Sequence, residues 1–111
     1  MKRIALCVAL AAATIAHAEF LTGNDLLAKL TDKTDNWGYA VGIGYISGVH
    51  DAGRSVVHCS PVTVTMGQLG DMTRMRLEQV PSIRNLSADV LILDMLKTAW
   101  PCAKKASPAM L

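Results

Sequence analysis

The stretch LSADVLILDMLKTAWPC, residues 86–102, decides the fold class of this chain. Its apolar side chains from Val90 onward could form a buried strand, but Met95, Leu96 and Ala99 continue them with helical period. The flanking residues carry the signals that begin and end a helix: N-cap Ser87, the staple pair Leu86 and Leu91, first-turn Asp89, last-turn Lys97 and the terminating Pro101. We therefore predict a helix between Ser87 and Pro101.

Two further helices are predicted upstream from their capping residues. The pattern Thr65-x-x-Gln68 opens a helix over residues 66–80, which Pro81 ends. Nearer the N-terminus, Thr22 and Asp25 precede a leucine-rich segment and predict a helix over residues 24–31.

Between these helices, residues 37–52 show two rows with a period of four. One row is apolar and one is small: Trp37, Val41, Tyr45 and Val49; Ala40, Gly44, Gly48 and Ala52. Helical geometry explains both rows together. We expect the surface formed by Gly44, Tyr45, Gly48 and Ala52 to pack against another helix of the chain, the alternative being a self-association surface. We expect Trp37 and Trp100 to lie in the core.

The first eighteen residues resemble a secretory leader. Lys2 and Arg3 precede an apolar run, and Ala16-His17-Ala18 forms a small-x-small cleavage site. Cleavage after Ala18 would remove two of the 11 basic side chains and leave nine, which equals the number of acidic ones. A neutral mature domain lacks the basic excess that nucleic acid or an anionic membrane attracts. We expect an exported protein with a single domain over residues 19–111.

Cysteine usage supports one disulfide. Cys7 leaves with the leader, so Cys59 and Cys102 remain as a pair in an oxidising compartment. The sequence therefore predicts an all-α fold, a small four-helix domain stapled by a Cys59–Cys102 bridge.

No catalytic, metal or cofactor site is recognisable in the sequence. His50, Asp51 and His58 form the one close set of ligand-type residues, but they lack further ligands at a known spacing. An oxidised Cys59 beside His58 could not serve as a thiolate nucleophile. We expect a protein that is not an enzyme and that binds no metal or cofactor.

The chain resembles the Rap/Tai immunity proteins, which counter type VI secretion amidase toxins. Four segments carry the resemblance: GYISGVHDA at 44–52, CSPVTVTMGQL at 59–69, Pro81, and WPC at 100–102. The Cys59–Cys102 pairing agrees with the family. The chain departs from many relatives in one respect, since Leu30 and Gly42 stand where those relatives appear to carry a second cysteine pair.

The resemblance implies a periplasmic inhibitor of a cognate peptidoglycan amidase, often a homodimer that offers a protruding loop to the toxin's cleft. Here the corresponding connection is formed by Ser82, Ile83, Arg84, Asn85 and Leu86, with Ile83 as apolar anchor and Arg84 as a residue type that is enriched at interfaces. The alternative is an ordinary loop with Ile83 folded into the core.

Two other functions stay open at this point. A periplasmic acid-stress chaperone would also be a small exported helical protein with one disulfide. It would need a pH trigger, and the mature chain has only His50 and His58 as histidines, with no acidic cluster. An enzyme is the third hypothesis, and it has no motif to support it.

Overall fold

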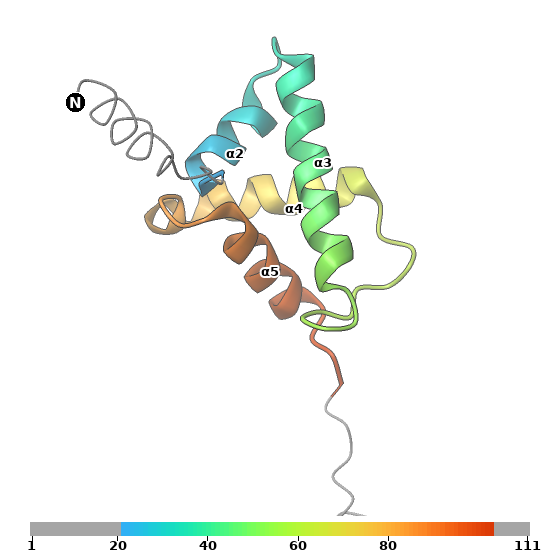
Figure 1. Cartoon of the computed structure of the whole chain (residues 1–111). Coiled ribbons are helices and arrows are strands. Elements are labelled where there is room, and N and C mark those ends of the chain that lie inside the picture. Colours follow the sequence, from blue (N-terminus) through green and yellow to red (C-terminus); the bar gives the residue numbers. More distant parts are fainter. Residues whose placement is uncertain (1–20, 104–111) are drawn as a thin grey trace, which may run out of the picture.

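The computed structural model describes residues 21–103, so the predicted leader (1–18) and its cleavage site lie outside the described residues. Figure 1 shows α-helices packed around a common centre, with a short 3-10 helix between the last two. The elements are α2 (Gly23–Thr31), α3 (Asn36–Gly53), α4 (Met66–Gln79), η1 (Pro81–Ile83) and α5 (Ala88–Ala99). The described part of the chain contains no strand, which confirms the predicted all-α fold with four helices.

Two helix starts follow the predicted caps. The Thr22 hydroxyl accepts a hydrogen bond from the Asp25 amide at 3.2 Å, and the Asp25 carboxylate accepts one from the Thr22 amide at 3.0 Å. The Thr22 amide, followed by the Thr22 hydroxyl, lowers the pKa of Asp25 below its ordinary value. At α4, the Thr65 hydroxyl accepts the Gln68 amide at 3.1 Å. These bonds use amides that have no partner inside the helix.

The start of α5 differs from the prediction. Ser87 occupies the N-cap position, but its hydroxyl makes no capping bond and donates to Asp89 instead. The Ala88 amide at the start of α5 donates to the Leu21 carbonyl at 2.8 Å. The chain just before α2 therefore supplies an acceptor for the first amide of α5, whereas a capping Ser87 hydroxyl would have accepted from Asp89 or Val90.

The core gathers apolar side chains from all four α-helices. α3 crosses α4, and α2 and α5 pack against both (Figure 1). The buried apolar residues are Leu26, Leu30, Ile46, Leu69, Leu77, Ala88, Leu91, Ile92, Met95 and Leu96. None of the helices within residues 21–103 combines the length and the apolar character needed to span a membrane.

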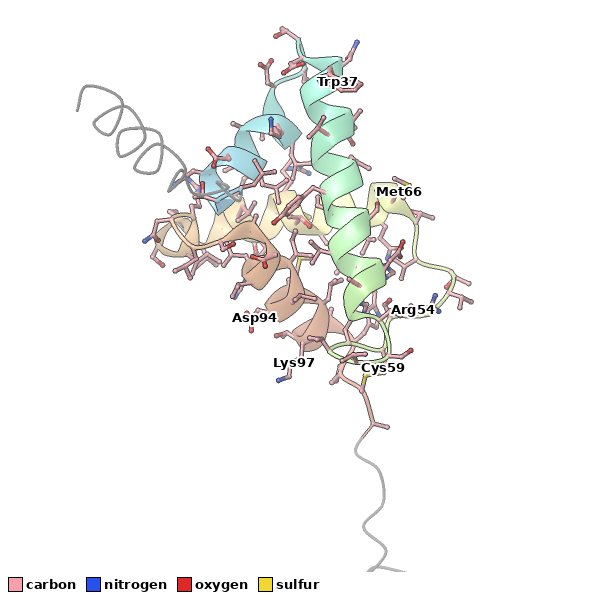
Figure 2. The ribbon with its side chains drawn as sticks, in the orientation of Figure 1. Trp37, Arg54, Cys59, Met66, Asp94 and Lys97 are labelled. Carbon is pink, nitrogen blue, oxygen red and sulfur yellow. A yellow bond between two sulfur atoms is a disulfide. The ribbon has the colours of Figure 1, made fainter. Side chains whose placement is uncertain are left out.

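The apolar row of α3 is divided between core and solvent, since Tyr45 and Val49 pack against the core. The expectation that Trp37 lies in the core is wrong. Trp37 is 78% exposed and lies at the outer end of α3 (Figure 2), whereas Trp100 is half-buried against the core as expected. The buried row of α3 runs one residue later: Gly38, Gly42, Ile46, His50 and Gly53. The row of small residues is correspondingly exposed.

Close packing of α3 depends on other glycines than the predicted ones. A Cβ added at Gly42 would lie 3.3 Å from the Lys29 Cβ and 3.5 Å from a Leu30 methyl of α2. At Gly44 and Gly48 nothing lies within 4 Å, so packing of these two glycines inside the chain is contradicted. The Leu30 side chain reaches Gly42, so the two positions of the missing cysteine pair are neighbours in the fold.

Candidate partner-binding site

The connection between α4 and α5, residues 80–87, is anchored on one side by Arg84. In a regular helix the Leu77 carbonyl would accept the amide of residue 81, but Pro81 has no N–H to donate. The Arg84 Nε donates to that carbonyl at 2.7 Å, and its Nη2 donates to the Glu78 carbonyl at 3.3 Å. The guanidinium thus meets the carbonyl end of α4, which carries partial negative charge.

The other side of the connection is bound to the start of α2. The Gly23 amide donates to the Leu86 carbonyl at 2.9 Å, and the Asn24 amide donates to the Arg84 carbonyl at 2.8 Å. Thr22 and Ser87 form an isolated antiparallel bridge between the same two segments. The free amides of the first turn of α2 therefore hold the carbonyls of the connection.

The predicted binding residues divide into two groups. Ser82 and Asn85 are exposed, whereas Ile83 is half-buried and packs against the core, as in the alternative stated above. Arg84 is half-buried and engaged with α4. The exposed large apolar residue of the connection is Leu86, at 47%. The sequence analysis placed Leu86 both in this connection and in a helix staple. Contact between these residues and a partner stays a prediction.

The outer row of α3, defined as Ala40, Gly44, Gly48 and Ala52, forms a second surface. All four residues are exposed, and Val41 and Trp37 are exposed beside them. Tyr45 is half-buried and packs against the core. Burial and the nearby Asp89 carboxylate raise the pKa of its phenol above the ordinary value. Of the four residues predicted for packing or dimerisation, three therefore face outward and Tyr45 faces inward.

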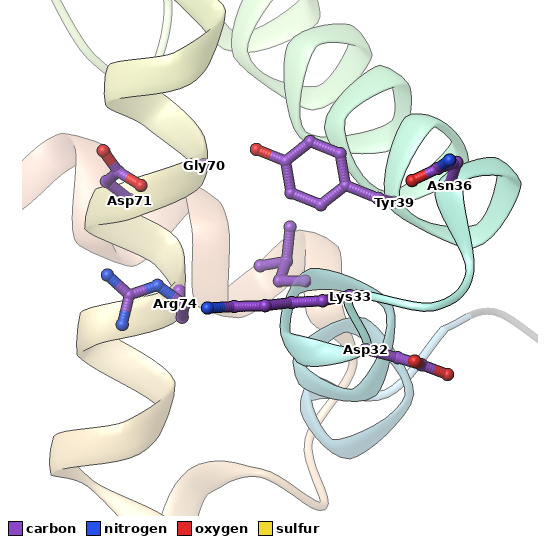
Figure 3. Close-up of a pocket in the computed structure, with 8 residues that line it drawn as sticks. Asp32, Lys33, Asn36, Tyr39, Gly70, Asp71 and Arg74 are labelled. Carbon is purple, nitrogen blue, oxygen red and sulfur yellow. The ribbon is translucent and has the colours of Figure 1, made fainter.

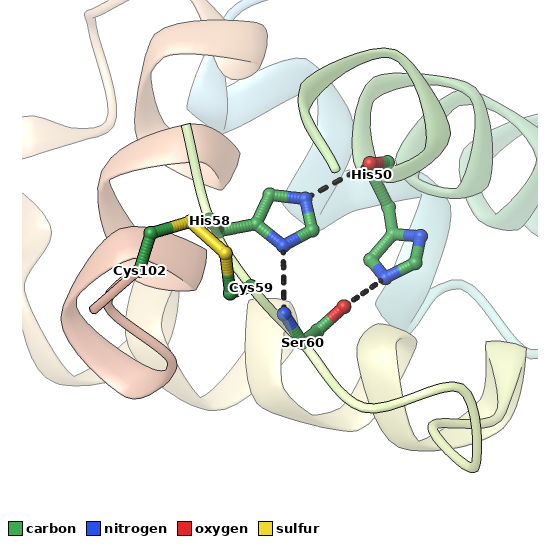
Figure 4. The surroundings of a disulfide bond; sticks show 5 residues. All are labelled: His50, His58, Cys59, Ser60 and Cys102. Atoms are coloured by element: carbon green, nitrogen blue, oxygen red, sulfur yellow. Dashed lines mark hydrogen bonds between the residues drawn. A yellow bond between two sulfur atoms is a disulfide. The ribbon is translucent and has the colours of Figure 1, made fainter. Parts of the chain in front are cut away.

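A buried polar cluster lies beside the disulfide (Figure 4). Cys59 and Cys102 form the predicted bridge, and the Cys59 amide donates to the Trp100 carbonyl at 2.8 Å. His58 is 0% exposed. Its Nε2 lies 2.9 Å from the His50 carbonyl, and its Nδ1 lies 3.3 Å from the Ser60 amide. Because a carbonyl only accepts and an amide only donates, Nε2 carries the proton and Nδ1 accepts.

Asp51, His50 and Ser60 are hydrogen-bonded in series. The Asp51 carboxylate lies 2.9 Å from His50 Nδ1, and His50 Nε2 lies 2.7 Å from the Ser60 hydroxyl. This order matches an acid–histidine–serine triad, but Ser60 is only 4% exposed. Its oxygen is therefore closed to a substrate, and the cluster orders the segment after α3. Within residues 21–103, no three His, Cys, Asp or Glu side chains are grouped to hold a metal.

A cavity of about 310 Å³ lies between the α2–α3 turn and α4. Lys33 extends toward Arg74 there, while Asp32 points away (Figure 3). The Thr34 hydroxyl and amide bind the Asp32 carboxylate and lower its pKa, and Arg74 pairs with Glu78 at 3.0 Å. With Asp71 also lining it, the cavity mixes both charges and has no single-sign feature that would select a charged ligand.

These features define a class: a small all-α domain with one disulfide, an internally anchored loop, and a polar cluster closed to substrates. Compared with known families, residues 22–102 match the Rap1a immunity proteins. The chain belongs to this family, which confirms the resemblance drawn from the motifs. Comparisons with curated proteins and with solved structures returned no match.

Membership supplies the general function. The protein is an immunity protein, and its binding partner is a cognate toxin.

Proposed function

We propose that the protein is exported to the periplasm, loses its leader after Ala18, and there binds and inhibits a peptidoglycan amidase delivered by type VI secretion. It would act by binding, without catalysis, and thereby protect the cell that produces the toxin. The leader pattern supports export, and membership in the immunity family supports toxin binding.

The observation that carries the proposal is the anchored connection of residues 80–87. Hydrogen bonds from α2 and from Arg84 hold it, while Ser82, Asn85 and Leu86 remain exposed on it. A rigid loop binds with little loss of conformational entropy, which suits insertion into an enzyme cleft. We propose that this connection contacts the toxin and covers its active site.

Replacing Leu86 by aspartate is expected to weaken toxin binding by about tenfold to a hundredfold, because a charge would replace the exposed apolar residue of the connection. Calorimetric titration of the mature protein with the amidase encoded in the adjacent reading frame measures this affinity. Met75→Asp on α4 is the matched control. Met75 is 48% exposed, almost the same as the 47% of Leu86, and it lies outside the connection. Equal affinities of the two variants would contradict a role for the connection. Absence of wild-type binding at micromolar concentrations would contradict the proposed function.

We further propose that two copies associate through the outer row of α3. The row lets another backbone approach closely, and the exposed Trp37 and Val41 flank it with apolar area. A Gly48→Arg variant should then be monomeric and still folded, since a Cβ at Gly48 meets nothing within 4 Å inside the chain. Analytical ultracentrifugation distinguishes the two masses. A monomeric wild-type protein would contradict the dimer without bearing on toxin binding.

A further inference from the structure

The connection of residues 80–87 has few bonds of its own. Inside it, the Ile83 amide donates to the Val80 carbonyl and the Arg84 amide to the Pro81 carbonyl, both at 3.3 Å. The Leu86 amide donates to the Ile83 carbonyl at 3.0 Å. The first two bonds are long for N–H···O contacts. The conformation of the connection must therefore depend on its neighbours.

The first neighbour is α4, through the Arg84 side chain. Pro81 deprives the Leu77 carbonyl of its helical donor, and the Arg84 guanidinium replaces that donor at 2.7 Å. A guanidinium can donate to two carbonyls at once, whereas a lysine ammonium is a compact charge on a flexible stem. The planar side chain thus fixes the position of Arg84 relative to the end of α4.

The second neighbour is the segment of residues 21–24, which we call the N-terminal clamp. Three backbone hydrogen bonds of 2.8–2.9 Å join it to residues 84–88, and two of them make up the bridge between Thr22 and Ser87. A Cβ at Gly23 would lie 2.9 Å from both the Cα and the carbonyl oxygen of Arg84. Only glycine permits this approach without displacing backbone.

We propose that Arg84 and the N-terminal clamp are positioning elements that hold the connection in its toxin-binding conformation. Arg84 then affects toxin affinity without touching the toxin, since its guanidinium is bound to α4. This inference rests on the proposed function. Removing either element lowers the fraction of molecules that are competent to bind, and the apparent affinity falls by the same factor.

Two variants test the proposal. Arg84→Ala removes the hydrogen bonds between the connection and α4, and Gly23→Ala adds a Cβ that displaces the N-terminal clamp from Arg84. We expect the amides of positions 23 and 24, whose acceptors are carbonyls of the connection, to exchange hydrogen faster in both variants. Binding to the amidase of the adjacent reading frame should weaken about tenfold, through a slower association rate with unchanged dissociation. Arg84→Lys should show an intermediate loss. Arg74→Ala, which removes a half-buried arginine of α4 that pairs with Glu78 and does not contact the connection through any hydrogen bond, should change neither measurement.

Each other outcome has a separate meaning. Unchanged amide exchange in both variants would overturn the positioning role whether or not a toxin binds. Faster exchange with unchanged affinity would overturn the inference and leave the proposed function standing. Faster dissociation of Arg84→Ala would make Arg84 a direct contact and overturn its positioning role. If the wild-type protein binds no toxin, the proposed function fails and the inference fails with it.

Discussion

Replacing both Cys59 and Cys102 by alanine is expected to lower the free energy of unfolding by about 2–5 kcal/mol. The bridge joins positions 43 residues apart, and the chain-entropy model gives about 4 kcal/mol for closing such a loop. This would be a large share of the ~5–15 kcal/mol that stabilises a typical domain. The bridge also ties the segment after α3 to the end of α5, where the Cys59 amide meets the Trp100 carbonyl.

Urea unfolding of the mature protein, followed by far-UV circular dichroism, measures the loss. The matched control is the wild-type protein under reducing conditions, which should unfold at the same urea concentration as the double variant. If reduction leaves the midpoint of the wild-type protein unchanged, the bridge is absent in solution. If the double variant alone is destabilised, the alanines act through lost packing and not through the missing bridge.

The helices could be predicted because their ends are encoded locally. Thr22 with Asp25 and Thr65 with Gln68 cap the helices that the sequence assigned to them, and Pro81 and Pro101 follow the helices that they were expected to end. Such caps involve residues only three positions apart, so they can be identified without the rest of the fold.

The orientation of α3 could not be predicted in the same way. The sequence analysis named two rows that recur every four positions, but a third row, at positions 38, 42, 46 and 50, has the same period. The pattern alone does not say which of these rows meets other helices. The structure buries the row of Gly42 and Ile46 because α2 and the core contact it, and it exposes Gly44 and Gly48. This choice depends on contacts with residues distant in the sequence, which explains why Trp37 was placed wrongly.

Part of the candidate site had a signal that the sequence analysis missed. Pro81, four residues after Leu77, implies an unpaired carbonyl at the end of α4 that a nearby arginine could satisfy. Arg84 was instead assigned to a partner, because arginine is common at interfaces. The attachment of residues 84–88 to residues 21–24 had no such signal, since it depends on backbone groups 60 or more positions apart in the sequence.

Replacing His58 by leucine is expected to lower the free energy of unfolding by about 2–5 kcal/mol. The ring is fully buried and makes two hydrogen bonds to backbone, from Nε2 to the His50 carbonyl and from the Ser60 amide to Nδ1. Leucine would leave that carbonyl and that amide buried without partners, at about 1–3 kcal/mol each. The change should also loosen the turn after α3, where the Ser55 amide donates to the His58 carbonyl at 2.7 Å.

One variant separates the hydrogen bonds of His58 from its volume, and a second serves as a control beside it. His58→Gln can place an amide donor near the His50 carbonyl, so it should lose less stability than His58→Leu in the same urea titration. Asp51→Asn removes the charge of the exposed side chain that accepts from the His50 ring but keeps an acceptor oxygen there. It should change stability by no more than about 0.5 kcal/mol, as surface substitutions usually do. Equal losses for the leucine and glutamine variants would mean that the His58 site stabilises the fold through packing alone. A leucine variant as stable as the wild type would show that the segment after α3 does not need the hydrogen bonds of His58, and that the disulfide suffices to order it.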